Sequence, residues 1–172
     1  VPEMMDGRVK TLHPLVHGGI LARRQRSDDL AAVERHGIRL IDLVAVNLYP
    51  FVRAAADPAT PFDDLIEEID VGGPSLVRAA AKNFRDVLVV VSPADYAKVL
   101  DALDRPGGPD LAFRFDLARQ AFTHTAGYDA AIAGALATVR VGAEGFTREL
   151  PAGALPERLV IQARKLRDLA HA

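Results

Sequence analysis

The chain has 172 residues, of which 49% are hydrophobic and 26% are charged, and its formal net charge at pH 7 is −2. This length and composition predict one main domain with an ordinary core. The near-neutral charge gives no sign of the excess of basic residues that binds nucleic acid or an anionic membrane surface. Cysteine is absent, which excludes disulfides, a thiol nucleophile and thiolate metal ligands, and fits a cytoplasmic protein.

The sequence contains no run of 18 apolar residues and no charged start followed by an apolar segment. Neither a membrane span nor a signal peptide is therefore predicted. The chain starts at Val1 rather than at methionine, in what reads as a loop or a short helix. We expect further sequence before Val1.

Residues 3–24 contain too much glycine and proline for a long regular element and are predicted to form a functional loop. Arg8, Lys10 and Thr11 supply two cations and a hydroxyl, the donor types that a phosphate or a carboxamide requires. An ordinary basic surface loop is an equally good interpretation. His13 and His17 have the spacing of zinc ligands on a helix, but neither the Glu of an H-E-x-x-H motif nor a third ligand type accompanies them, so no metal site is predicted.

The next segments predict a short helix and a buried strand. Asp28–Arg35 has the pattern of a short helix that ends at Gly37. Ile38–Val46 is an apolar run typical of a strand buried on both faces of a parallel sheet. Because ligands bind beyond the carboxyl ends of such strands, Asn47 and Tyr49 stand where a site is expected. The alternative is a strand-to-turn junction with a core tyrosine.

A proline-containing loop follows, and Thr60 is predicted to cap a helix that starts at Pro61 and runs through Ile69. Its four acidic residues are typical of a solvated face rather than of a metal cluster.

The stretch from Asp70 to Asn83 combines a carboxylate, a glycine turn, a helix start and paired cations. Gly73 suits the cap and Pro74 the first helical position, so unpaired N–H groups are expected beside Gly72 and Gly73, in an anion-friendly place. Such a stretch is also an ordinary way to begin and fill a helix.

Arg78 and Lys82 are one turn apart in this predicted helix, and an anion between them would remove their mutual repulsion. A helix rises about 1.5 Å per residue, so roughly 12 Å separate Pro74 from Lys82. Asp70 and Lys82 can therefore share a ligand only if the helix lies along the cleft.

The rest of the chain predicts one more buried strand and two helices. Asp86–Val91 reads as the strand, and Ser92 starts a helix that ends near Arg105. Residues 110–138 have helical spacing of apolar residues and predict the longest helix. On it, His124 and Tyr128 are interpreted as core or dimer-face groups rather than as catalysts. From residue 142 onward the composition shifts toward loops.

Alternation of buried strands with amphipathic helices predicts an α/β domain with a mainly parallel sheet. Two strong strands are few for such a sheet, which again suggests that strands precede Val1.

Four separated motifs carry a family resemblance. They are residues 6–14 (Asp-Gly-Arg-Val-Lys-Thr-Leu-His-Pro), 47–51 (Asn-Leu-Tyr-Pro-Phe), 70–83, and 121–129 (Ala-Phe-Thr-His-Thr-Ala-Gly-Tyr-Asp). Together and in this order they resemble the family of the bifunctional purine-biosynthesis enzyme AICAR transformylase/IMP cyclohydrolase. Residues 1–141 match the cyclohydrolase domain without its first strands. Residues 142–172 match the linker and the start of the transformylase domain.

The resemblance implies a methylglyoxal-synthase-like, Rossmann-like three-layer fold and a homodimer. It implies closure of formyl-AICAR, a formamidoimidazole-carboxamide ribotide, to IMP with loss of water, the ring-closing direction of a cyclic-amidine hydrolase. No metal or organic cofactor is implied for this step. The 10-formyltetrahydrofolate of the second activity belongs to the transformylase domain, which is absent beyond its start.

By matching position, the resemblance assigns two sets of residues. The active-site set is Lys10, Tyr49, Asp70 and Lys82, and the nucleotide-binding set is Arg8, Thr11, Asn47, Val71 and Gly72.

Ring closure requires alignment of a poor amide nucleophile, removal of its proton and stabilisation of an oxyanion. Lys82 is the candidate proton shuttle, and Asp70 would orient or deprotonate the amide. Tyr49 and Lys10 would donate to oxygen, while Asn47 or nearby backbone N–H groups would hold the oxyanion.

One departure and two alternatives stand beside this interpretation. The family's glycine- and serine-containing phosphate loops precede the segment at which this sequence begins. Half of the groups expected to bind the phosphate are therefore not in this sequence. A nucleotide-sensing regulatory module of the same fold, as in carbamoyl-phosphate synthetase, is one alternative, against which the Tyr49, Asp70 and Lys82 combination argues. A methylglyoxal-synthase-like lyase is the other, against which the run from Arg8 to Pro14 argues.

Overall fold

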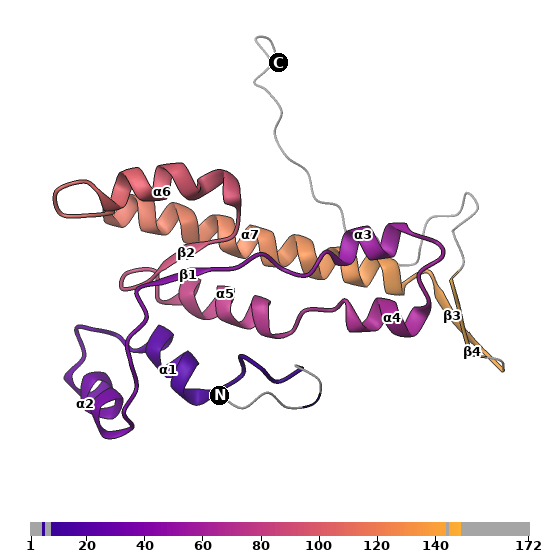
Figure 1. Ribbon diagram of the computed structural model, residues 1–172, viewed down its shortest axis with the longest axis horizontal. Helices are drawn as coiled ribbons and strands as arrows, with labels where there is room; N and C mark the ends of the chain where they lie inside the picture. Colours follow the sequence, from indigo (N-terminus) through magenta and orange to yellow (C-terminus); the bar gives the residue numbers. More distant parts are fainter. Residues whose placement is uncertain (1–4, 6–7, 144, 149–172) are drawn as a thin grey trace, which may run out of the picture.

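The computed structural model describes residue 5, residues 8–143 and residues 145–148. Helices alternate with strands along the chain, which confirms the predicted α/β class (Figure 1). The elements in chain order are α1 (Pro14–Leu21), α2 (Ser27–Arg35), β1 (Leu43–Ala45), α3 (Phe51–Ala56), α4 (Phe62–Glu67), α5 (Gly72–Lys82), β2 (Leu88–Val90), the 3₁₀ turn η1 (Pro93–Asp95), α6 (Tyr96–Leu103), α7 (Leu111–Leu136), β3 (Val139–Gly142) and β4 (Gly145–Arg148).

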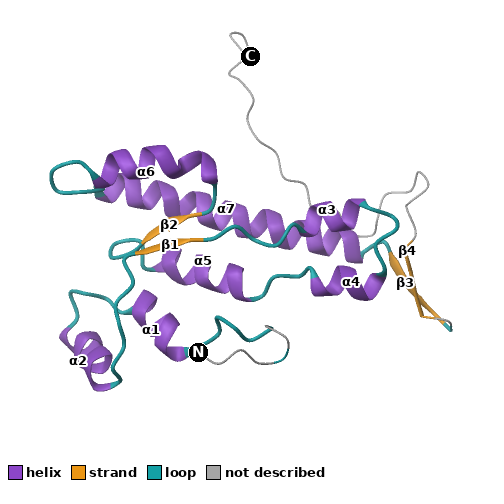
Figure 2. Ribbon diagram, viewed as in Figure 1, coloured by secondary structure: helices purple, strands orange, loops and turns teal. Residues whose placement is uncertain are grey.

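Strands β1 and β2 pair in parallel, with Leu43 opposite Leu88 and Ala45 opposite Val90. The predicted parallel sheet is therefore present as these two strands. In the view of Figure 2, α6 and α7 lie on one side of the pair and α1 and α5 on the other. Helix α5 packs on both strands and α7 packs on β2, so helices cover the sheet from two sides.

Strand β1 is shorter and less buried than its sequence predicts. Only Leu43–Ala45 is in strand conformation, and only Val44 of these three residues is buried. Strand β2, by contrast, is buried at all three positions, as predicted. The difference follows from helix cover, because α5 packs on both strands whereas α7 packs on β2.

Two hydrophobic clusters hold these elements together. The larger one joins β2 to the inward faces of α5 and α7, with Val77, Val89 and Leu117 among its buried members. The smaller one consists of Phe51, Leu65 and Tyr128 and links α3, α4 and α7. This second core lies under the loop that leads into α5, and it therefore sets where that loop runs.

Residues 14–21, which the sequence assigns to a loop, form helix α1 instead. His13 caps it, with Nδ1 accepting from the N–H of Leu15 at 3.2 Å, and Pro14 occupies the first turn. Its glycines serve packing, because a Cβ on Gly19 would collide with the backbone carbonyl of Arg39. Glycine thus lowers helix propensity here but permits the close approach that tertiary packing needs.

The region between β1 and α5 also differs from the prediction. Helix α3 was not expected, and its first residue, Phe51, is fully buried. Helix α4 ends at Glu67, and its cap is Pro61 without a side-chain hydrogen bond, so the predicted cap at Thr60 is wrong. Both helices have only six residues and depend on burying one large side chain each, Phe51 and Leu65.

The later helices agree with the sequence. Helix α2 ends before Gly37, whose φ of 61° is the left-handed conformation that glycine favours. Ser92 caps η1, which leads into α6, and Asp110 caps α7, where its carboxylate accepts from the N–H of Phe113 at 2.8 Å. No helix in the described part of the chain is long and apolar enough to cross a membrane.

A β-hairpin replaces part of the loop expected from residue 142 onward. Strands β3 and β4 pair antiparallel, and Phe146 stacks on Phe62 of α4 with ring centroids 4.2 Å apart. Arg148 donates to the carbonyls of Ala55 and Asp57 at the end of α3. These contacts attach the hairpin to the short helices. Residues 149–172, most of the stretch matched to the linker and the start of the transformylase domain, lie outside the described residues.

Candidate functional site

Helix α5 begins at Gly72, two residues before the predicted first helical position, Pro74, and its N-cap is Val71, so the predicted cap at Gly73 is wrong. A side chain outside the helix bonds to its first turn. The Oδ1 atom of Asp70 accepts a hydrogen bond from the N–H of Gly73 at 2.7 Å. Asp70 precedes the N-cap residue Val71, and its carboxylate satisfies the N–H of the second residue of the helix, which has no partner within the helix. The Gly73 N–H, which the sequence left open for an anion, is therefore already paired, and Asp70 is held in a defined orientation.

Both glycines at this helix start are needed for close packing. A Cβ on Gly72 would collide with Oγ1 of Thr11, and a Cβ on Gly73 would collide with the Asp70 carboxylate and lie 2.8 Å from Cδ2 of Leu48. Three segments, around Thr11, Leu48 and Asp70, therefore meet at the first turn of α5. Segments that are distant in the sequence therefore come together here.

Tyr128 of α7 ties the loop before α5 to the rest of the molecule. Its hydroxyl accepts from the N–H of Asp70 at 2.9 Å and donates to the carbonyl of Glu68 at 3.1 Å. The side chain is 7% exposed and meets Phe51 edge-on, with centroids 6.3 Å apart. Burial raises the pKa of the Tyr128 phenol, so it stays protonated near neutral pH.

Arg8 reaches the same region from the N-terminal segment. Its guanidinium contacts both carboxylate oxygens of Glu67, at 2.9 Å and 3.2 Å, at the end of α4. Both side chains are exposed, so the pair positions the segment more than it stabilises the fold. Lys10, between Arg8 and Thr11, is also exposed.

Asn47 and Tyr49 follow β1 and flank Leu48. Leu48 packs on the second core and against Gly73, whereas Asn47 and Tyr49 are exposed, Tyr49 at 55%. This alternation is that of extended chain, in which neighbouring side chains point to opposite sides. The alternative interpretation of Tyr49 as a core residue is therefore wrong, and its phenol is accessible.

Lys82 lies at the opposite end of α5 from Asp70. Val71, Arg78 and Lys82 are separated by seven and four residues, so they share one exposed face of the helix over a length of about 16 Å. The structure thus brings Thr11, Asp70 and Gly72 together and leaves Lys82 about three turns away.

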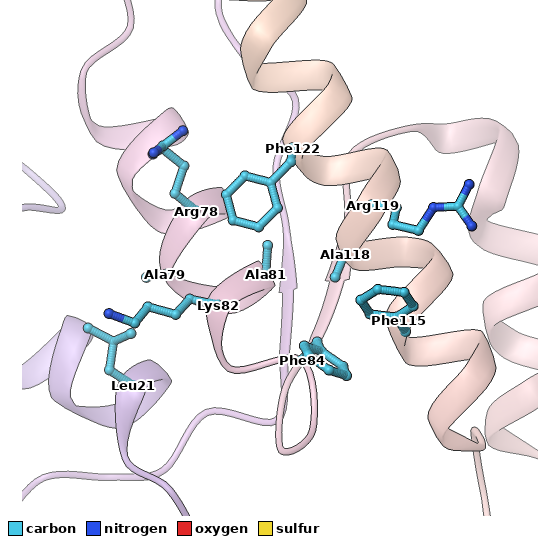
Figure 3. Close-up of a pocket in the computed structure, with 10 residues that line it drawn as sticks. All are labelled: Leu21, Arg78, Ala79, Ala81, Lys82, Phe84, Phe115, Ala118, Arg119 and Phe122. Carbon is cyan, nitrogen blue, oxygen red and sulfur yellow. The ribbon is translucent and has the colours of Figure 1, made fainter.

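Beside Lys82 a pocket of about 520 Å³ opens between α5 and α7 (Figure 3). Phenylalanine rings and alanines line it, and cations border it; the lining residues are Leu21, Arg78, Ala79, Ala81, Lys82, Phe84, Phe115, Ala118, Arg119 and Phe122. The guanidinium of Arg78 lies 5.6 Å from the centroid of the Phe122 ring, within cation–π range. Lys10, Tyr49 and Asp70 do not line this pocket, so a ligand common to them and Lys82 must lie along α5.

Two residues at this site were not predicted as part of it. Glu67 was interpreted only as part of a solvated acidic face, and Tyr128 as a core or dimer-face group. A sequence signal for Tyr128 exists, because Leu117, Ala121, Thr125 and Tyr128 follow helical spacing and are all buried on one face of α7. Within the residues that the structure describes, no group of three His, Asp or Glu side chains could hold a metal ion.

Comparison with known proteins assigns the chain to a family. The family model described as the AICARFT/IMPCHase bienzyme matches residues 80–170, more than half of the chain. The bifunctional purine biosynthesis protein PurH of Oceanobacillus iheyensis is 56% identical over 132 residues, which are 77% of this chain and 26% of that protein. The chain therefore spans about a quarter of the length of this relative.

A solved structure agrees with this assignment. The crystal structure of ForH superposes with a TM-score of 0.67 at 40% sequence identity, covering 79% of this chain and 70% of that one. The chain thus belongs to the AICARFT/IMPCHase bienzyme family.

Proposed function

We propose that this chain contributes the IMP cyclohydrolase of a bifunctional purine-biosynthesis enzyme, which closes formyl-AICAR to IMP. Family membership supports the reaction, and one structural observation supports its location here: Thr11, Leu48 and Asp70, from three separate motifs, meet at the first turn of α5. A regulatory module that only binds nucleotide has no need for a carboxylate held this firmly together with the accessible phenol of Tyr49.

The finer features of the proposal follow the family. They are a methylglyoxal-synthase-like three-layer fold, a homodimer in the cytoplasm, a cyclohydrolase domain in residues 1–141, and a linker with the start of the transformylase domain in residues 142–172. The cyclohydrolase step uses no cofactor, and 10-formyltetrahydrofolate serves the transformylase domain.

In the reaction, the carboxamide nitrogen attacks the formyl carbon, a C–N bond forms, and the formyl oxygen leaves as water after taking up protons. One carboxylate oxygen of Asp70 is bonded to the Gly73 N–H, which leaves Oδ2 as the acceptor for an amide proton. Tyr49 and Lys10 stand on the two segments that flank α5 and donate to the developing oxyanion. Arg8, Thr11, Asn47, Val71 and Gly72 bind the nucleotide.

Lys82 takes part as a proton shuttle if the substrate lies along the exposed face of α5. That face extends about 16 Å from Val71 to Lys82, and the long lysine side chain shortens the distance further. Arg78 lies between Val71 and Lys82 on this face and adds a second cation for an anionic ribotide.

The experiment supplies formyl-AICAR to the full-length protein, including any sequence that flanks this chain, and follows IMP formation. General acid–base catalysis typically contributes 10²–10⁴-fold, so Lys82→Ala and Asp70→Asn should each lower kcat by about that factor. Lys98→Ala is the matched control, because Lys98 lies on α6 and pairs with Asp95.

Unchanged turnover in Lys82→Ala would remove Lys82 from the mechanism. Nucleotide binding without IMP formation by the intact protein would contradict the proposal and favour the regulatory module.

A further inference from the structure

We propose that Tyr128 is a positioning residue, which acts through the backbone of residues 68–70 to place the Asp70 carboxylate. This inference rests on the proposed function. The Tyr128 hydroxyl donates to the carbonyl of Glu68 at 3.1 Å and accepts from the N–H of Asp70 at 2.9 Å. One side chain therefore makes two hydrogen bonds to the loop between α4 and α5.

These two hydrogen bonds join residues far apart in the sequence, unlike the other hydrogen bonds that the structure describes in this loop. Ile69 donates to the carbonyl of Ile66, and Asp70 accepts from Gly73, so both contacts are local. Tyr128 is 58 residues from Asp70 in the sequence. It therefore connects the loop to α7, whereas the local bonds connect it only to the adjacent helices.

The position of the hydroxyl is itself set by packing. The ring of Tyr128 is buried against Phe51, which is fully buried, and both belong to the second core with Leu65. Because its ring is fixed by packing, the phenol holds the loop in one position relative to α7. Its raised pKa keeps the hydroxyl able to donate to Glu68.

Replacement by phenylalanine keeps the ring and removes both bonds. The loop would then shift relative to α7, and Asp70 would move with it, although its own hydrogen bond from the Gly73 N–H persists. Because a displacement of about 1 Å at a reacting group costs on the order of 10²-fold, we expect Tyr128→Phe to lower kcat by about 10- to 100-fold, with a smaller change in KM.

The decisive experiment is a double-mutant cycle in the full-length protein with formyl-AICAR as substrate. If Tyr128 acts through Asp70, adding Tyr128→Phe to Asp70→Asn lowers kcat little further than Asp70→Asn alone. A full 10- to 100-fold additional loss in the Asp70→Asn background, or an unchanged kcat in Tyr128→Phe, would overturn the proposal. Tyr96→Phe is the control, since it removes the same hydroxyl from a residue that is 44% exposed on α6 and should leave kcat unchanged.

Amide hydrogen exchange separates this inference from the proposed function, because it needs no substrate. In the wild-type protein the Asp70 N–H should be protected, and in Tyr128→Phe it should exchange at least 10-fold faster while buried amides of β2 keep their protection. A protein that makes no IMP but shows this pattern would contradict the function and support the role of Tyr128 in the loop. A wild-type Asp70 N–H without protection would contradict the role of Tyr128 even if Tyr128→Phe did not fold.

Discussion

The two ends of α5 carry candidate catalytic groups that are held in different ways. At the N-terminal end, Asp70 is bonded to Gly73 and its backbone to Tyr128, above a core that contains the fully buried Phe51. At the C-terminal end, Lys82 is exposed beside a pocket with a cationic border. The chain itself therefore orients the carboxylate, whereas the flexible lysine side chain takes its orientation from what it binds.

The largest effect that would test this comparison is loss of the core under the N-terminal end. Phe51→Ala removes a fully buried ring and should lower the free energy of unfolding by about 3–5 kcal/mol. The matched substitution at the other end, Phe115→Ala, affects a ring that is 50% exposed and should cost well under half as much. Urea denaturation followed by circular dichroism measures both values, and equal losses would show that the two ends do not differ in packing.

The next effect concerns the glycine at the helix start. Gly73→Ala places a Cβ against Asp70 and Leu48, so overpacking of about 1–3 kcal/mol should outweigh the gain in helix propensity. Gly134→Ala in α7 meets nothing within 4 Å and should instead stabilise the protein by about 0.5–1 kcal/mol. Opposite signs in thermal or urea unfolding are expected, and stabilisation by Gly73→Ala would contradict the close packing at this turn.

The smallest effect separates the structural roles of Asp70 and Lys82. Asp70→Ala removes the side-chain hydrogen bond to the first turn of α5 and, like the loss of a helix cap, should destabilise the fold by about 0.5–2 kcal/mol. Asp70→Asn retains an acceptor oxygen and should lose less. Lys82→Ala changes an exposed side chain and should stay within about 0.5 kcal/mol. If the same urea measurement gave Lys82→Ala the larger loss, the ordering of the two ends would be reversed.

Sequence reasoning succeeded where local patterns decide the structure. The long helix α7, strand β2 and the helix from Gly72 to Lys82 follow from apolar spacing, β-branched runs and capping residues. It failed for α1 and α3, whose sequences have weak helical signals. Helix α1 forms because its glycines let it pack against residues 38–41, and α3 because Phe51 has a core to enter.

The candidate site shows the same division. Its residue types and motifs are readable in the sequence, and the family resemblance orders them along the chain. Which of them touch is not readable, since Arg8 pairs with Glu67, and Tyr128 with Asp70, across about 60 residues of chain. The exposure of Tyr49 likewise follows from Leu48 taking the inward position beside Gly73.

By itself, the sequence determined the α/β class, the main helices and the chemical groups available for catalysis, because these depend on neighbouring residues and on periodicity. Only the tertiary structure decided that the Asp70 carboxylate is bonded to Gly73 and steadied through Tyr128, and that Lys82 stands three turns away. The physical reason is that contacts between distant segments depend on how helices and strands pack, and no local pattern encodes that packing.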